Sequence, residues 1–129
     1  MDQQLAHIAL LVNDYDEAIE FYTQKLGFIL VEDTVLSEVK RWVLVKPPGS
    51  STALLLAKAA NDKQQTRVGD QTGGRVFLFL YTDDLKRDYK NLQDKAVKIV
   101  REPVAETWGT VAVFEDLYCN LWDLIEPEK

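Results

Sequence analysis

Two segments of this chain are similar enough to indicate an internal repeat. The first runs from His7 to Asp14, and the second starts seventy positions later and runs from Phe77 to Asp84. Each is an apolar run, as expected of a buried strand, and each closes on residue types that favour turns and helix N-caps. Apolar residues then recur at matching, helix-like offsets in both copies: Tyr15, Ile19, Tyr22 and Leu26, then Leu85, Tyr89, Leu92 and Ala96. A duplicated strand and helix therefore constrain the fold.

The remainder of each copy predicts three further strands. Gly27 suits the end of the first helix, and Pro47 to Ser51 must turn. Arg101-Glu102-Pro103 is predicted to end the short strand over 97–100 in the second copy. The predicted strands are 5–12, 28–31, 35–45, 52–57, 76–81, 97–100, 111–114 and 120–125, with helices over 14–26 and 84–95. We therefore predict an α+β fold, a single domain over 1–129 built from two βαβββ modules at about 1–58 and 75–129, joined by a polar linker over 59–74.

Composition excludes some classes of function. Fifteen basic against twenty-one acidic residues give a formal charge of −6, which would repel a phosphate backbone, so nucleic acid is not an expected partner. No apolar stretch reaches membrane-spanning length, and no signal peptide is evident. The single cysteine, Cys119, fits a reducing compartment, so we expect a cytoplasmic location. Without a second histidine or an identifiable base, Cys119 is weakly supported as a nucleophile.

Two ionisable residues lie in apolar strands. His7, the only histidine, heads the first strand, where a hydrogen-bonded core or rim histidine is the commoner explanation than a ligand. Asp123 lies within Leu121-Trp-Asp-Leu-Ile125, where a carboxylate facing the core is costly unless it is paired or metal-bound. Because neither face of that strand is polar, Asp123 is a candidate for a cavity wall, although it could also face water.

Several aromatic residues are candidate ligand contacts. Phe77, Phe79 and Tyr81 share one face of a strand, where aromatics normally form core and less often a stacking wall. Trp42 and Trp108 lie near strand starts, where an indole could close the mouth of a pocket. The guanidinium of Arg41 could do the same, but Arg41 is equally well explained as a solvated strand residue. Trp108 is the stronger candidate because Gly109 beside it permits close backbone approach.

The chain resembles the vicinal oxygen chelate superfamily, which includes glyoxalase I, bleomycin-binding proteins, fosfomycin resistance proteins and ring-cleaving dioxygenases. The resemblance rests on the opening motif, from His7 to Tyr22 followed by Lys25-Leu-Gly-Phe28, and on the closing motif from Phe114 to Ile125. Cys119 stands where glycine is usual in the closing motif. The resemblance implies a homodimer of paired βαβββ modules, which together curl an eight-stranded sheet around a cavity.

The resemblance also implies where a divalent metal ion would bind. Its four ligand positions fall on His7, near Leu54 or Leu55, on Phe77 and on Asp123. Leucine and phenylalanine offer no lone pair, so His7 and Asp123 form an incomplete metal-ligand set, whereas a catalytic zinc site typically has three protein ligands. No cofactor is therefore certain, and a divalent ion would need waters or a chelating substrate as further ligands.

Three functions remain open from the sequence. The leading one is a small-molecule-binding protein that sequesters a partly aromatic ligand, with candidate contacts His7, Trp42, Phe77, Phe79, Tyr81, Trp108 and Asp123. The second is a glyoxalase-type metal-dependent lyase, isomerase or dioxygenase acting on vicinal oxygens through His7 and Asp123; its catalytic residues are unknown. The third is an interaction subunit whose cavity is filled by its own aromatics.

Overall fold

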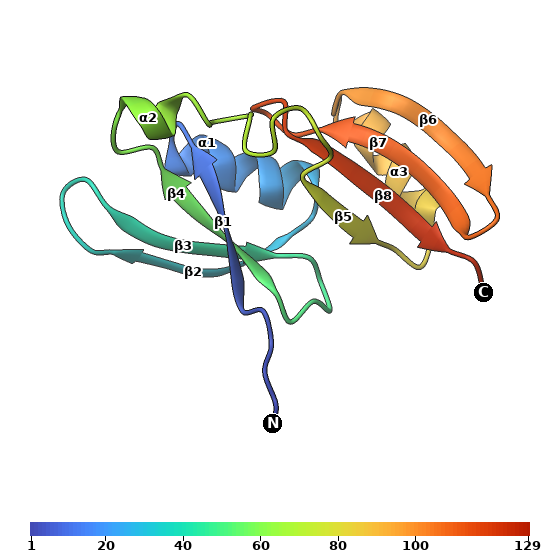
Figure 1. Ribbon diagram of the computed structural model, residues 1–129, viewed down its shortest axis with the longest axis horizontal. Helices are drawn as coiled ribbons and strands as arrows, with labels where there is room; N and C mark the ends of the chain where they lie inside the picture. The colour runs from blue at the N-terminus through green and yellow to red at the C-terminus, as the bar shows by residue number, and fades with distance from the viewer. The chain divides into compact units, whose positions relative to one another are not determined.

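Each copy of the repeat forms its own four-stranded mixed sheet with a helix on one face (Figure 1). The computed structural model describes residues 1–129, and the chain divides into two units, 1–69 and 70–129. The first sheet has the strand order β1-β4-β3-β2 and the second has the equivalent order β5-β8-β7-β6. The predicted α+β fold of two βαβββ modules is therefore confirmed. No helix of the chain is long and apolar enough to cross a membrane.

The first unit buries part of its apolar core, including Leu10, Val12, Val43 and Val45, on the side of its sheet that faces its first helix. Its elements are β1 (His7–Val12), α1 (Tyr15–Glu20), a π-helical turn (Phe21–Lys25), β2 (Ile29–Val35), β3 (Arg41–Lys46), β4 (Ala53–Lys58) and the short α2 (Asp62–Gln65). Strand β1 pairs with β4 in parallel, and β3 pairs antiparallel with β4 and β2. Leu10 and Val12 of β1 are fully buried on the helix side, whereas His7 and Ala9 are exposed on the opposite side. This alternation confirms the predicted shared face of His7, Ala9 and Leu11.

The second unit repeats this arrangement. Its elements are β5 (Leu78–Tyr81), α3 (Leu85–Asp94), β6 (Ile99–Glu106), β7 (Gly109–Glu115) and β8 (Leu121–Pro127). Helix α3 buries Leu85 and Leu92 towards the sheet. On that side of the sheet the rings of Phe114 and Trp122 are stacked, with centroids 5.9 Å apart, and both side chains are buried.

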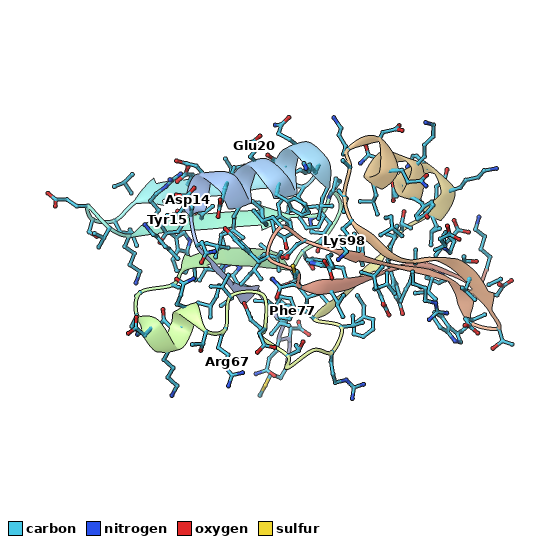
Figure 2. All side chains as sticks on the ribbon, turned by 90° about the horizontal axis from the view of Figure 1, so that it is seen from above. Asp14, Tyr15, Glu20, Arg67, Phe77 and Lys98 are labelled. Atoms are coloured by element: carbon cyan, nitrogen blue, oxygen red, sulfur yellow. The ribbon has the colours of Figure 1, made fainter.

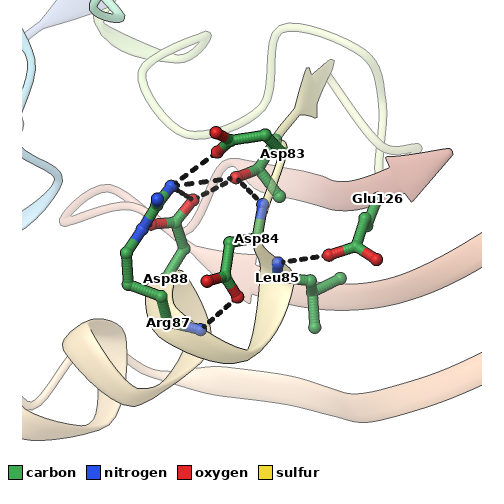
Figure 3. A network of polar contacts seen from close by, with 7 residues as sticks. Asp83, Asp84, Leu85, Arg87, Asp88 and Glu126 are labelled. Atoms are coloured by element: carbon green, nitrogen blue, oxygen red, sulfur yellow. Dashed lines mark hydrogen bonds and ion pairs between the residues drawn. The ribbon is translucent and has the colours of Figure 1, made fainter.

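Both predicted helix caps are present. The Asp14 carboxylate accepts a hydrogen bond from the Glu17 N–H at 2.9 Å, and Figure 2 shows Asp14 and Tyr15 at the start of α1. The Asp84 carboxylate accepts from the Arg87 N–H at 3.0 Å. At the same end of α3 the Leu85 N–H donates to Glu126 of β8 at 2.9 Å, which ties the helix to its sheet (Figure 3). Each aspartate thereby satisfies an amide that the helix itself leaves unpaired.

The two helices differ by one residue at their C-terminal ends. Tyr22 and Leu92 are matching buried positions seventy residues apart, but the positive-φ residues that end the helices, Gly27 and Ala96, are sixty-nine apart. The π-helical turn holds the extra residue, since the Leu26 N–H donates to the Phe21 carbonyl five positions back. Ala96, predicted to lie on the apolar stripe of α3, is instead exposed just beyond the C-cap Lys95.

The predicted bounds of two of the edge strands, β2 and β6, were wrong. Strand β2 includes Glu32-Asp33-Thr34, which were expected to separate two strands, and β3 begins at Arg41 rather than at Val35. Strand β6 continues through Pro103 to Glu106, with register shifts on either side of Arg101. An edge strand has one row of backbone groups that pair with no neighbouring strand, so it accepts proline and polar residues that a central strand excludes.

Candidate functional site

Asp123 lies on the face of the second sheet opposite α3. In the register of the sheet it is flanked by Phe79 on β5 and by Val113 on β7, and Val113 is paired in turn with Arg101 on β6. Neither flanking side chain can donate a hydrogen bond, and the half-buried Asp123 carboxyl makes none within the chain. Burial raises the pKa of Asp123, and the positive charge of Arg101 opposes that rise.

Two exposed aromatic side chains share this face with Asp123. Phe79 is 63% exposed and Tyr81 is 71% exposed, and both belong to the edge strand β5, which pairs only with β8. Phe77 precedes them on the same face, is half-buried, and donates its N–H to the Leu121 carbonyl at 2.8 Å. We call the surface formed by Phe77, Phe79, Tyr81 and Asp123 the aromatic face.

Trp108 lies in the turn between β6 and β7, where its side chain is 52% exposed. Its carbonyl accepts a hydrogen bond from the Glu128 N–H at 3.0 Å, which fixes the turn against the end of β8. Gly109 has a φ of +149°, and a Cβ atom built on it would lie 2.5 Å from the Glu126 carbonyl oxygen. The predicted close backbone approach at Gly109 is therefore confirmed.

In the first unit, His7 and Trp42 meet across the face opposite α1. Their ring centroids are 6.1 Å apart in an edge-to-face arrangement. The strand neighbours on this face are small or aliphatic: Ala53 is paired with His7, and Leu55 with Ala9. The second implied metal-ligand position was placed near Leu54 or Leu55. Of these two, Leu55 lies on the same face as His7, whereas Leu54 lies on the helix side.

Arg41, considered above for a pocket mouth, instead ties together three elements of the first unit on the helix side of the sheet. Its guanidinium binds Asp33 of β2 through two hydrogen bonds, at 2.7 and 3.1 Å, and Asp16 of α1 at 2.9 Å. It also lies 5.1 Å from the centre of the Tyr15 ring. The hydrogen bond from Arg41 holds the pKa of Asp33 below its usual range. Arg41 is therefore a structural residue.

Comparisons with known proteins are consistent with this architecture. Residues 4–124 match the family model of the Glyoxalase/Bleomycin resistance protein/Dioxygenase superfamily. The chain belongs to this superfamily. An uncharacterized protein of Shewanella frigidimarina (strain NCIMB 400) is 59% identical to it over 98% of this chain and 95% of that protein.

Two crystal structures resemble this chain over nearly its whole length. UcmS2 has a TM-score of 0.85 and 30% identity, covering 98% of this chain and 99% of its own. TnmS3, an antibiotic binding protein from Streptomyces sp. CB03234, has a TM-score of 0.80 and 28% identity, covering 98% of each chain.

The metal ligands that the superfamily resemblance implies do not form a set within either unit. In the first unit the strand neighbours of His7 and Ala9 are Ala53 and Leu55; in the second, Asp123 is flanked by phenylalanine and valine. No group of three or more His, Cys, Asp or Glu side chains gathers as a metal site would require. The side chains at these positions therefore do not fit the ligand set of such a metal site.

Sequence reasoning missed Asp116, which organises the turn between β7 and β8. Its carboxylate is buried and accepts three hydrogen bonds, from the N–H groups of Tyr118 and Asn120 at 2.9 Å and from the Asn120 amide at 2.8 Å. Cys119 within this turn has a φ of +73°, a backbone conformation that glycine adopts without strain. Desolvation and the nearby Glu115 carboxylate raise the pKa of the Cys119 thiol although the residue is exposed, and this disfavours the nucleophilic thiolate.

We expect Cys119→Gly to stabilise the second unit. A side chain in the left-handed region costs about 1–2 kcal/mol, and the extra freedom of glycine in the unfolded chain offsets about half of it. Chemical denaturation should therefore show a gain of about 0.5–1 kcal/mol. Cys119→Ala is the matched control, since it removes the thiol but retains the Cβ atom. An equal gain in both variants would assign the effect to the thiol instead.

We also expect Asp123→Asn to stabilise the protein at neutral pH. Because the pKa of Asp123 is raised by folding, its ionised form is disfavoured in the folded state, and stability falls as pH rises from the unfolded pKa through the folded one. The asparagine should add about 0.5–1 kcal/mol at pH 7, as is common when an unfavourable charge is removed. Denaturation at pH 3, where aspartate is protonated in both states, should show little difference. A gain of equal size at both pH values would contradict this explanation.

Proposed function

We propose that this protein binds a small, partly aromatic molecule on the aromatic face and sequesters it. The observation that carries the proposal is the exposure of Phe79 and Tyr81 beside the Asp123 carboxyl, which makes no hydrogen bond or ion pair within the chain. Large exposed aromatic side chains on a sheet face are typical of ligand or partner contacts. In a cavity filled by its own aromatics these rings would be buried, so the exposure of Phe79 and Tyr81 supports an open face instead. The likeness to the antibiotic binding protein TnmS3 also supports this function.

The other predicted contacts fit the same function. His7 and Trp42 offer a second aromatic pair on the helix-free face of the first sheet, and Trp108 offers an exposed indole at the end of the second. Each ring presents an apolar surface with a polar group at its edge. Such residues bind a planar ligand by contact area and orient it by hydrogen bonds.

The test is a thermal-shift screen of aromatic and heterocyclic compounds, followed by titration of those that bind. Ligand binding to the native state must raise the apparent stability. We expect Phe79→Ala and Tyr81→Ala each to weaken binding by about tenfold, through loss of ring contact. Val35→Ala is the matched control, because Val35 is 72% exposed on β2 and lies outside the aromatic face. A screen without stabilising compounds would refute the proposal.

We further propose that the protein acts as a cytoplasmic homodimer. Support comes from the superfamily resemblance, from the free thiol of Cys119, and from the edge strand β2, whose apolar Ile29, Leu30 and Val31 are all exposed. Apolar edge strands are normally covered or blunted. Light scattering should give twice the monomer mass of 14.7 kDa, and a monomer would contradict the proposal.

A further inference from the structure

Asp123 differs from three other acidic side chains of the second unit, Asp116, Glu126 and Glu115. Asp116 accepts three hydrogen bonds, Glu126 accepts one from the Leu85 N–H, and Glu115 lies 3.5 Å from the Lys98 ammonium. Asp123 alone among these four has no hydrogen bond or ion pair within the chain. A half-buried carboxyl without a donor is unfavourable unless something outside the chain supplies one.

The residues beside Asp123 restrict what that donor is. Phe79 on one side and Val113 on the other present only hydrocarbon, so a ligand bound to Asp123 lies beside an aromatic ring. An ionised carboxylate only accepts hydrogen bonds, and its bonds are strongest with a charged N–H donor. The faces of Phe and Tyr rings also attract cations. Carboxylate and rings together therefore favour a positively charged nitrogen.

We propose that the ligand of the aromatic face is a cationic aromatic compound: its protonated nitrogen donates to Asp123 and its apolar body lies against Phe79 and Tyr81. This inference rests on the proposed function and adds the charge of the ligand to it. The formal charge of −6 favours a cation at long range. The competing positive charge, Arg101, is one strand beyond Val113 and is engaged by Glu106 at 3.4 Å.

Three probes that share a naphthalene ring test this assignment. The probes are 1-naphthylmethylamine, which is a cation at pH 7, 1-naphthylmethanol, which is neutral, and 1-naphthylacetate, which is an anion. Isothermal titration should rank their affinities in that order. We expect the amine to bind about tenfold more tightly than the alcohol, the usual gain from a hydrogen bond between two charged groups.

Variants separate the role of charge from that of the rings. Asp123→Asn, which keeps the shape of the side chain, should reduce the amine-to-alcohol ratio to about one while the alcohol still binds. Glu115→Gln is the matched control, because Glu115 is a carboxylate on the same face that already has a partner, and its variant should leave the ratio unchanged. Phe79→Ala should weaken the binding of both the amine and the alcohol and leave the amine-to-alcohol ratio unchanged.

The outcomes distinguish this inference from the proposed function. If the alcohol binds as tightly as the amine, or if Asp123→Asn leaves the ratio unchanged, the cationic assignment fails and the binding function stands. A failure of all three probes to bind would overturn both. Circular dichroism and the denaturation midpoint of each variant show whether it is folded.

Discussion

Replacement of Asp116 by alanine is expected to cost about 3 kcal/mol of folding free energy, which is large for one residue of a small domain. The Asp116 side chain is only 5% exposed, and its loss leaves three donors of the β7–β8 turn without their acceptor. Unsatisfied buried donors cost about 1–3 kcal/mol each, and water reaching the opened turn recovers part of that. Urea denaturation followed by tryptophan fluorescence measures the loss.

Asp94→Ala is the matched control for this experiment. Asp94 is exposed and pairs only with Lys90, one helical turn away, at 3.1 Å. Exposed pairs of this kind contribute about 0.3–0.5 kcal/mol. Equal losses in the two variants would show that the hydrogen bonds of the β7–β8 turn contribute little. Because this turn sets the start of β8, we also expect Asp116→Ala to weaken ligand binding at Asp123, even where the protein remains folded.

The parts of the fold that sequence predicts well are those fixed by local chemistry. Asp14 and Asp84 are caps because a short acidic side chain reaches the amide three residues ahead, whatever the rest of the chain does. The alternation of β1 follows from strand geometry alone. The internal repeat then predicts the whole architecture, because two copies of one sequence pattern are expected to fold into the same arrangement of strands and helix.

The features that sequence missed depend on partners distant in the chain. Pro103 lies within β6 because β6 is an edge strand, and no local pattern distinguishes an edge from a centre. Arg41 binds Asp16, twenty-five residues away, so its role could not be read from its own strand. Asp123 was identified as unusual from its apolar neighbours, but the absence of a hydrogen-bond partner requires the register of β5, β7 and β8. Asp116 could have been found from an aspartate heading a short turn before an apolar strand.

The aromatic face links stability to function. An exposed pair of aromatic rings and an unpaired carboxyl both lower the stability of the isolated protein, yet both become favourable when a ligand covers the rings and donates to the carboxyl. The stabilisation expected for Asp123→Asn and the loss of cation preference expected in the same variant are therefore two consequences of one arrangement. A residue kept only for folding would show neither.

Replacement of Gly109 by alanine is expected to destabilise the second unit by about 3 kcal/mol, because a Cβ atom at this position overlaps backbone rather than a movable side chain. The ideal Cβ would lie 2.5 Å from the Glu126 carbonyl oxygen and 3.0 Å from the Pro127 Cα atom. Relief requires β7 to separate from the end of β8, which would also disturb the Trp108 turn bonded to Glu128. Denaturation measures the cost, and tryptophan fluorescence, to which Trp108 contributes together with Trp42 and Trp122, reports the local change.

Gly74→Ala separates the two causes of this loss. Gly74 also has a positive φ, +99°, but an added Cβ atom there meets nothing within 4 Å. Its substitution therefore carries only the backbone strain, about 1 kcal/mol. If Gly109→Ala cost no more than Gly74→Ala, the tight approach of β7 to the end of β8 would be wrong. A difference of about 2 kcal/mol would instead locate the restriction in that contact, which sets the position of the candidate ligand residue Trp108.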